Sequence, residues 1–421
     1  DFAGVNNYES YTTKKRNTLS HFFLNYDLDL NLDNYTISDL ELTFERSSKA
    51  SYLPVFEQYI TKNIDLRPIN FHRLSNRIDL DLQHENYSFK TGIIAYDNLK
   101  EEKKSDRYQY GFPYYTFSRG INQNFFPGNI NFDSDGDNWL TNTNTLQTTI
   151  FNALTYNSLD YISNLGLKSN FGANYRQLNF VGKKSSVYDS SPKSEIISLY
   201  NLDISLPLIK ESEEFTNNLT PKLSFRFNPS DMRDHSASKM NLSVANVFAL
   251  NRLGLSDSFE SGRSLTLGLD YNIERLNTAP EVEEGDESKP SYKVESANKI
   301  EEINNYFNLR LATVLRDKEE NFIPSRSTIN RKNSNLFGAV ESKLSENILA
   351  GYDFSLDNDF NTFEHNGIYT TFSNNNIVAT FNFAEENGER GDESSFATEI
   401  EYNFNDENFL TFKTRRNRKI N

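Results

Sequence analysis

Three aspartates at alternate positions form the first group whose spacing suggests chemistry. Asp133, Asp135 and Asp137 stand in the stretch DSDGDNW, and carboxylates at the first, third and fifth positions open a calcium-binding loop. Such a loop has glycine at its sixth position and a closing glutamate, whereas here glycine comes fourth and the glutamate is missing. We therefore interpret the stretch as a solvated acidic loop, and we interpret the carboxylate cluster EVEEGDES at 281–288 in the same way.

The histidines offer little for catalysis. A serine hydrolase needs a histidine beside a nucleophile and an orienting carboxylate, and the sequence contains no G-x-S-x-G elbow. Each histidine stands alone in an expected strand or loop, so none has the partners that general-base work requires. The five are His21, His72, His84, His235 and His365. The chain has no cysteine, which excludes a cysteine nucleophile and thiolate metal sites. We predict that the protein is not an enzyme and has no catalytic, cofactor-binding or metal-binding residue.

Composition narrows the class of fold that could carry these residues. The chain has 421 residues, a formal net charge of −15 and 36% hydrophobic residues, yet 14% of its residues are aromatic. A disordered acidic chain is poor in aromatics, and a soluble domain of this size carries more aliphatic residues. A transmembrane β-barrel with aromatic girdles has this composition. The acidic balance argues against nucleic acid as a partner, and the lack of an apolar run of about 18 residues argues against a transmembrane helix.

Alternation with a period of two recurs along most of the chain. In FFLNYDLDLNL (22–32), apolar residues occupy every second position from Phe22, and Asp or Asn stands between them at 25, 27, 29 and 31, as in a strand with one apolar side. A turn at Asp33 and Asn34 would join this run to DLELTF at 39–44. Similar runs occupy 197–208, 264–273, 347–356 and 396–404. Such runs are long enough for tilted strands to cross a bilayer, and counting them predicts roughly 18–20 strands.

The connections between these runs are of two kinds. Tight turns are expected at 345–347 and 405–408, and long polar connections at 98–107, 182–195, 228–240 and 275–300. Outer-membrane barrels have tight periplasmic turns and long extracellular loops. We therefore predict an all-β fold, a large antiparallel transmembrane β-barrel with apolar faces toward lipid and Asp/Asn faces toward the lumen. A soluble β-sandwich, propeller or solenoid is the alternative, and the last two lack the fixed repeat that they require.

One stretch is distinctive beyond its alternation. LTPKLSFRFNPSDMRD (219–234), followed by NVFALNRLGLSDSFESGRSLTLGLDYN (246–272), resembles the LPS-assembly outer-membrane protein family, LptD, also called organic solvent tolerance protein. The residues that match its pattern are Pro221, Asn246, Phe248, Leu250, Asn251, Arg252, Asp257, Glu260, Gly262, Leu265, Thr266, Gly268, Leu269 and Tyr271. Further similar segments lie at 47–53, 105–119, 311–317 and 411–421, in the order of the family.

The resemblance implies a function and partners. It implies movement of lipopolysaccharide through the outer membrane of a Gram-negative bacterium to the outer leaflet. The implied partners are lipopolysaccharide, outer-membrane lipid, an LptE-like lipoprotein plug in the lumen and a periplasmic LPS-bridge protein. A porin or a TonB-dependent receptor barrel for small solutes remains the alternative, and a soluble surface-adhesion protein is a third possibility that detergent partitioning would separate.

The resemblance also suggests which parts of such a protein are present. We expect residues 1–421 to form an outer-membrane β-barrel domain, without the periplasmic jelly-roll of the family and without its last strands. On this expectation the chain alone does not close the barrel. No residue of a lateral gate is assigned, and the disulfides of the family have no counterpart because no cysteine is present.

The lead-in NVFALNRLGLSDSFESG suggests a structural role for the matching residues. We expect Phe248, Leu250 and Leu253 to pack back on the barrel or against a luminal partner. The polar members, which we expect to form one hydrogen-bonded and charge-paired cluster, are Asn251, Arg252, Asp257 and Glu260. Burial of a lone charge is costly, so a packed lead-in requires a carboxylate partner for Arg252. Gly262 would allow unusual dihedral angles where the chain turns into the next strand.

Overall fold

A computed structural model describes residues 2–9, 16–101, 103–122, 125–255, 257–277, 302–404 and 408–419. Nearly all of this part of the chain is antiparallel β-sheet, and its 21 strands belong to one sheet. The predicted fold class is therefore confirmed. The first strands are β1 (Phe2–Glu9), β2 (Arg16–Asp29), β3 (Tyr35–Ser47), β4 (Arg73–His84), β5 (Tyr87–Asn98), β6 (Tyr108–Ile121), β7 (Gly128–Thr141), β8 (Thr145–Ser158), β9 (Tyr161–Ile162) and β10 (Lys168–Lys183).

The remaining strands continue to the end of the described chain. They are β11 (Lys193–Ser205), β12 (Leu208–Glu211), β13 (Phe215–Asn228), β14 (Gly262–Asn277), β15 (Glu302–Arg316), β16 (Leu336–Ser345), β17 (Ile348–Leu356), β18 (Phe363–Asn374), β19 (Ile377–Glu386), β20 (Glu393–Asn403) and β21 (Phe409–Lys419). The helices are short: α1 (Tyr52–Val55), α2 (Glu57–Asn63), α3 (Lys104–Arg107), η1 (Ser325–Ser327) and η2 (Gly388–Arg390). No helix among the described residues is long and apolar enough to cross a membrane.

The long strands pair in chain order, with β8 next to β10 and β11 next to β13 beside the short β9 and β12. This order is why local alternation was enough to predict the strands. The β13–β14 ladder, for example, runs without a break from Phe215 opposite Arg275 to Asn228 opposite Gly262. In the described residues β1 pairs only with β2, and β21 pairs only with β20, so the ladder is open. The structure has slightly more strands than predicted, because β9 and β12 are separate pieces of two and four residues.

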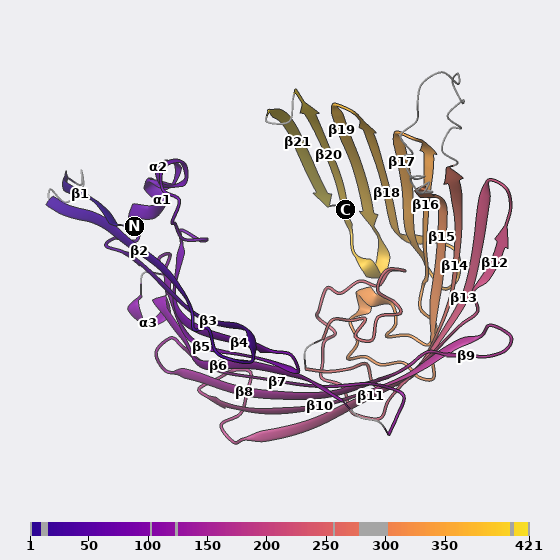
Figure 1. Ribbon diagram of the computed structural model, residues 1–421, viewed down its shortest axis with the longest axis horizontal. Helices are drawn as coiled ribbons and strands as arrows, with labels where there is room; N and C mark the ends of the chain where they lie inside the picture. The colour runs from indigo at the N-terminus through magenta and orange to yellow at the C-terminus, as the bar shows by residue number, and fades with distance from the viewer. Residues whose placement is uncertain are drawn as a thin grey trace, which may run out of the picture. The chain divides into compact units, whose positions relative to one another are not determined.

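The chain divides into two compact units. Unit 1 contains residues 1–158 and 173–198, and unit 2 contains residues 159–172 and 199–421. In unit 1, α1 and α2 lie beside β2 (Figure 1). Their side chains Tyr52, Leu53 and Ile60 form a buried cluster with Phe23 and with neighbouring strand residues. This cluster covers one side of the first strands of unit 1.

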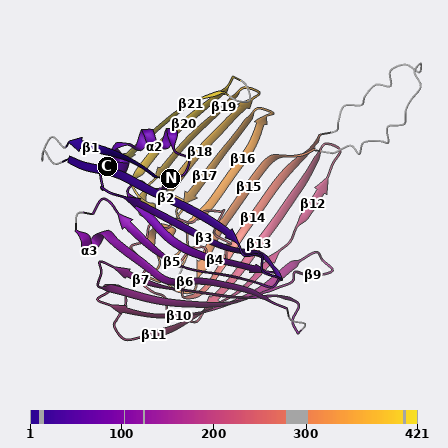
Figure 2. The same ribbon diagram turned by 60° about the vertical axis from the view of Figure 1, so that its left-hand side comes forward.

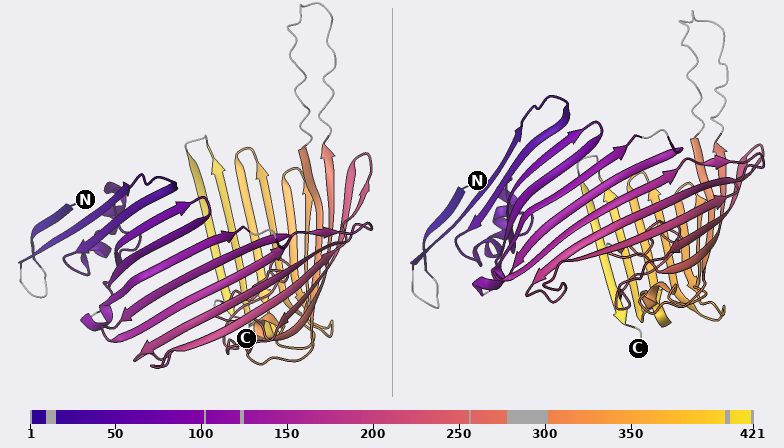
Figure 3. Two further views of the ribbon diagram at one scale, coloured as in Figure 1. Left: turned by 60° about the horizontal axis from the view of Figure 1, so that its bottom comes forward. Right: turned by 90° about the horizontal axis from the view of Figure 1, so that it is seen from below.

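In unit 2, strands β13 to β19 run side by side (Figure 2). Two long segments without strands, 229–261 and 317–335, lie against them at the end where β21 finishes (Figure 3). The tight turns after β16 and β18, at 346–347 and 375–376, connect the opposite ends of the strands. The first of these turns lies where the sequence predicted it. The predicted turn at 405–408 and the long connection at 275–300 lie largely outside the described residues.

The two faces of β13, β14 and β15 differ in chemistry. Residues opposite one another in a ladder share a face, so Leu223, Leu267 and Thr313 lie in one row, next to a row of Phe225, Leu265 and Leu315. Leu267 is exposed on this apolar face. The other face carries Lys222 bonded to Asp270, both about one third exposed. The alternating pattern thus separates apolar from polar residues as the sequence indicated.

Two expectations about local structure are wrong. The stretch DSDGDNW is not a loop, because it lies within β7. Asp133, Asp135 and Asp137 are therefore spread along one face about 7 Å apart per step, and their carboxylates cannot converge on one calcium ion. The run predicted at 197–208 is also broken, because Pro207 separates β11 from β12. The cluster at 281–288 lies outside the described residues.

The apolar face generates a test of strand orientation. Replacing Leu267 with Arg should cost about 2–4 kcal/mol of unfolding free energy if this face meets the middle of a bilayer. Replacing Asp270 with Arg removes a partly exposed pair with Lys222 and places a like charge opposite Arg310, and on a hydrated face the two effects should together cost about 1 kcal/mol. Urea-induced unfolding in lipid vesicles measures both values. Equal losses at the two positions would contradict the orientation.

Candidate functional site

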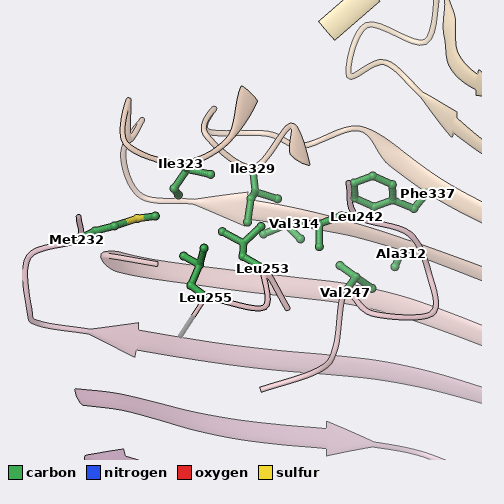
Figure 4. Close-up of a cluster of buried hydrophobic side chains, with 10 residues drawn as sticks. All are labelled: Met232, Leu242, Val247, Leu253, Leu255, Ala312, Val314, Ile323, Ile329 and Phe337. Carbon is green, nitrogen blue, oxygen red and sulfur yellow. The ribbon is translucent and has the colours of Figure 1, made fainter. Parts of the chain in front are cut away.

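The distinctive segment of the sequence is a largely buried connection that packs on one face of unit 2. The lead-in motif NVFALNRLGLSDSFESG belongs to a longer connection between β13 and β14, residues 229–261, and we call this whole connection the lead-in segment. It contains no strand, yet Leu242, Val247 and Leu253 are at most 3% exposed. Figure 4 shows these side chains directed toward residues of β15, β16 and the 317–335 connection. The complete buried cluster is Met232, Leu242, Val247, Leu253, Leu255, Ala312, Val314, Ile323, Ile329 and Phe337.

Small side chains on the strands make room for the lead-in segment. Ser224, Thr266 and Val314 lie in one row across β13, β14 and β15 and are fully buried. One step along the strand, a Cβ on Gly268 would lie 2.5 Å from Cζ of Phe248. Phe248 therefore packs directly over the backbone of β14, and only glycine permits this approach. This close contact explains why glycine occupies this position on the polar face of β14.

Arg252 and Glu260 form the charged centre of the lead-in segment. The Arg252 side chain is completely buried, and its Nε and Nη2 donate to Oε1 and Oε2 of Glu260 at 2.6 and 2.5 Å. Two further guanidinium hydrogens, one on Nη1 and one on Nη2, bond the hydroxyls of Thr266 (3.0 Å) and Ser264 (3.1 Å) on β14. A bidentate pair with further hydrogen bonds is the arrangement in which burial of an arginine is tolerated.

Two further arginines reach the same region from the strands. Arg226 of β13 donates Nη1 to the carbonyl oxygen of Leu250 at 3.1 Å and Nη2 to those of Phe248 and Ala249 at 3.0 and 2.5 Å. Arg316 of β15 donates to the carbonyl oxygen of Ser261 and lies 3.5 Å from Oε2 of Glu260. These bonds join strand side chains to the backbone of the lead-in segment, so both arginines fasten the segment to the sheet.

The surroundings of Glu260 favour the ionised form of its carboxyl group. Burial alone would raise the pKa of its carboxyl, but the positive charge and hydrogen bonds of Arg252 outweigh burial, and Arg226 and Arg316 add to the effect. The pKa of Glu260 therefore lies below its ordinary value. The enclosed space beside Arg252 is only about 10 Å³ in volume, enough for a single water molecule. This arrangement fixes a chain path and has no room for a substrate.

The other matching residues take separate positions. Asn251 exchanges two hydrogen bonds with the backbone of Leu255, and Asn246 bonds the backbone of Asn241 and Ser243. Gly262 has φ +84°, a conformation that favours glycine, at the start of β14. Leu250 is half-buried.

Two further matching residues lie on the strands. Pro221 stands opposite Leu269 on the apolar face. Tyr271 donates its hydroxyl to Asn217 at 3.0 Å. These two residues are outside the charged cluster and belong to the packing of the β13–β14 pair.

Asp257 does not join the cluster that the sequence predicted. Its Oδ2 lies 3.3 Å from Nη1 of Arg233, and its Oδ1 lies 3.0 Å from Nε2 of His235. The correction has a physical reason. The guanidinium of Arg252 already has a bidentate carboxylate partner in Glu260. A second carboxylate there would bring two negative charges together in a buried environment.

The expectation that every histidine stands alone is wrong for four of the five. The ring of His84 stacks on Tyr87 and its Nδ1 accepts from the backbone N–H of Asn86 at 3.2 Å. His235 lies beside Asp257, and the ring of His21 lies 3.1 Å from the hydroxyl of Tyr52. His365 lies between two carboxylates, 2.5 Å from Oδ2 of Asp353 and 2.8 Å from Oε1 of Glu386. No group of three metal-ligating side chains that could hold an ion occurs in the described part of the chain.

The sequence analysis missed several residues that hold the site together. Besides Arg226 and Arg316, Arg390 links η2 to the buried segment, because Nη1 donates to the carbonyl oxygen of Leu242 at 2.8 Å and Nε to Glu386 at 3.0 Å. Ser261 also donates to Glu320 at 2.5 Å. One feature of the sequence could have indicated such arginines: an arginine at a polar-face position of a strand that is otherwise rich in apolar residues, as in SFRFN at 224–228.

Comparison with known proteins identifies the family. The sequence profile of LptD, described as LPS transport system D, matches residues 20–409. The chain belongs to the LptD family. The match covers the lead-in segment and nearly all strands of both units, so the resemblance recognised in the sequence is confirmed. Membership in the LptD family links the chain to lipopolysaccharide transport and to the outer membrane, and it does not favour the porin or TonB-dependent receptor alternative.

Other comparisons add little to the LptD match. No curated protein matches the chain. Among solved structures, the siderophore receptor PiuA from Acinetobacter baumannii is similar, with 9% identity and a TM-score of 0.29 over 98% of this chain and 76% of that chain. A likeness at this level says nothing about what the LptD-family chain transports.

The buried ion pair generates a prediction about assembly. Arg252→Ala leaves Glu260 buried without its bidentate partner and should cost about 3–5 kcal/mol. Arg263→Ala, on the neighbouring β14 and exposed, loses only a contact over the ring of Phe227 and should cost about 1 kcal/mol or less. The fraction of heat-modifiable, folded protein in outer membranes measures the difference. Equal assembly of the two variants would contradict the role assigned to Arg252.

The lowered pKa of Glu260 generates a prediction about pH. A carboxyl whose pKa is lower in the folded protein contributes stability above its unfolded pKa, near 4.5. This stability is lost as the pH falls from there through the folded value. The unfolding free energy of the unmodified protein should therefore exceed that of Glu260→Gln at neutral pH, and the gap should close at acidic pH. A gap that stays constant from about pH 7 to about pH 3 would contradict the prediction.

Proposed function

We propose that this chain forms the wall of an outer-membrane translocon that assembles lipopolysaccharide into the outer leaflet of the outer membrane. The observation that carries the proposal is the LptD match over residues 20–409. Two features of the sheet support it. One face of β13–β15 is apolar, as contact with lipid requires, and the other carries charged and amide side chains such as Lys222, Asp270 and Asn272, as a hydrated passage requires.

The two parts of lipopolysaccharide would follow the two different faces of the sheet. The glycan of lipopolysaccharide is polar and anionic, so it would travel along the hydrated face, while the acyl chains would leave sideways into lipid. Residues 1–421 would form one barrel domain in the outer membrane. The protein would perform no covalent chemistry on its cargo, because its role is passage. An LptE-like lipoprotein seated in the lumen and a periplasmic LPS-bridge protein are the partners that we propose.

The lead-in segment has a defined place in this function. It is fixed to β13, β14 and β15 by Arg226, Arg252 and Arg316, at the end of unit 2 where the long segments lie (Figure 3). A segment bound so firmly would permanently occupy part of the passage beside the polar face of the barrel wall. It would also present a rigid surface to a luminal partner.

Depletion of the full-length protein in its own bacterium tests the proposal. Lipopolysaccharide at the cell surface should fall, and newly made lipopolysaccharide should accumulate in the inner membrane, while outer-membrane proteins of other families keep their levels. Surface exposure is measured by accessibility of lipopolysaccharide to an enzyme added outside the cells. Unchanged surface lipopolysaccharide with lost uptake of a small solute would instead establish the porin or receptor alternative.

Purification from detergent extracts tests the proposed partners. The full-length protein should co-purify with a lipoprotein in a constant ratio, and the complex should persist in salt because luminal contacts are largely shielded from solvent. A matched sample of an unrelated barrel from the same membranes serves as the control. Recovery of the protein alone, or with an equal amount of lipoprotein in the control, would contradict the proposed plug.

A further inference from the structure

A groove opens on the apolar face of the first strands of unit 1. Strands β3 to β6 run side by side (Figure 2), and the groove on them has a volume of about 360 Å³, within the range of small-molecule sites. Large side chains from all four strands form its walls: Leu42, Phe44, Ile78, Ile93, Tyr110 and Phe112. Phe44, Ile78, Ile93 and Phe112 are 38–47% exposed, so the groove lies on the outer, apolar side of the sheet.

Smaller side chains form the floor of the groove. Asn76 of β4 stands opposite Ala95 of β5, and Ala95 stands opposite Tyr110 of β6, so the three residues share a face. The methyl group of Ala95 leaves a recess between its larger neighbours. The amide of Asn76 is turned toward β3, because its Oδ1 accepts from the backbone N–H of Glu45 at 3.0 Å. The floor is therefore low, and the carbonyl oxygen of its amide already has a hydrogen-bond partner.

Two interruptions of the hydrogen-bond ladders produce the recess. The β3–β4 ladder ends before Glu45 and Ser75, and the backbone N–H of Ser75 donates instead to Oε2 of Glu45 at 2.6 Å. The β5–β6 register also shifts, so that Phe112 and Pro113 of β6 together face Ile93 of β5. A bulge of this kind bends the strand and redirects its side chains. The shape of the groove is thus determined by the backbone as well as by the size of its side chains.

Charged side chains begin one row beyond the groove. Arg46 follows Phe44 on the same face of β3 and is exposed. On β5, Asp97 follows Ala95, and its Oδ2 accepts from Nη2 of Arg107 at 2.9 Å. Alternate residues of a strand are about 7 Å apart, so this face changes from apolar to charged over about that distance. Such a change is expected where the apolar band of a barrel meets lipid headgroups.

The position of the groove indicates what fills it. The chain belongs to an outer-membrane family, and the groove is continuous with the apolar face that meets lipid. An empty recess would deprive its walls of dispersion contacts, and an acyl chain is the flexible apolar group that the bilayer supplies. Asp97 neutralises Arg107, whereas Arg46 is exposed one row from the groove. One recess beside one exposed cation matches a lipid with a single phosphate better than a lipid with two phosphates and many chains.

We propose that the groove of β3 to β6 binds one acyl chain of an anionic glycerophospholipid, with its phosphate beside Arg46. The inference goes beyond the proposed function, because it concerns a lipid that stays at the barrel wall. It does not depend on which molecule the barrel transports. The bound chain would supply packing contacts at the place where the strand ladders are interrupted.

Photo-crosslinking in a bilayer tests the proposal. The full-length protein is placed in nanodiscs that contain phosphatidylglycerol with a photoreactive diazirine on one acyl chain, and labelled peptides are identified by mass spectrometry. Peptides with residues 42–44, 93–95 and 110–112 should be labelled about tenfold more than the peptide with residues 350–354 of β17. Equal labelling of the two regions would overturn the proposal, because ordinary contact with bilayer lipid predicts that result.

Filling the recess tests its part in binding. Ala95→Trp should reduce labelling of the groove to the level of β17, and Ala95→Leu should reduce it partly. Ala379→Trp is the matched control, because Ala379 lies on the apolar face of β19 between Phe372 and Ile400 and does not line the groove. Heat-modifiable migration verifies that each variant is folded. Unchanged labelling in folded Ala95 variants, or an equal loss in Ala379→Trp, would overturn the proposal.

Headgroup and competitor arms identify the lipid. Phosphatidylglycerol should label the groove about threefold more than phosphatidylcholine with the same chain, as an exposed charge pair allows, and Arg46→Gln should remove this difference. Equal labelling by the two lipids in the unmodified protein would overturn the anionic assignment. Displacement by unlabelled bisphosphorylated lipid A at lower concentration than by unlabelled phosphatidylglycerol would overturn the phospholipid assignment. Labelling in nanodiscs that is absent in native outer membranes would show that a protein covers the groove instead.

Discussion

Burial of a guanidinium is the constraint on which unit 2 depends. Arg252 is removed from water completely, and its charge is tolerated because Glu260 accepts from two of its nitrogens while Ser264 and Thr266 each accept one further hydrogen. Isolated burial of such a charge would be prohibitive. The acceptors come from both the lead-in segment and β14, so the hydrogen bonds of the buried Arg252 are complete only when the segment lies on the strand.

The other interactions of the segment follow from that placement. Arg226 reaches three consecutive carbonyl oxygens, and Phe248 covers Gly268, where no larger residue leaves space. The apolar cluster of Figure 4 adds the non-directional part of the stabilisation. Polar contacts therefore determine the path of the chain, and apolar burial holds it there. The result is a rigid surface on the polar side of a sheet whose other side is apolar.

Sequence patterns predicted the strands far better than they predicted the site. Alternation identified β14, β17 and β20 because each pairs with its chain neighbours, so local information determined the ladder. It failed at Pro207, where a missing N–H interrupts the run, and at Asp133, where alternating carboxylates belong to a strand. The pairing of Arg252 with a carboxylate could be predicted from the sequence, because burial of its charge without a partner would be costly. The roles of Arg226 and Arg316 could not, because their partners lie 22 to 56 residues away in the chain and only the fold brings them together.

The central claim is that residues 242–261 form a packed element although they contain no strand. Hydrogen–deuterium exchange of the backbone amides, measured on the full-length protein in detergent, tests it directly. The account predicts that amides of Val247 and Leu255, which donate to Ser243 and Asn251, exchange as slowly as those of β14. Exchange as fast as in the exposed connection at 184–192 would contradict the account, because a mobile segment could not keep Arg252 buried.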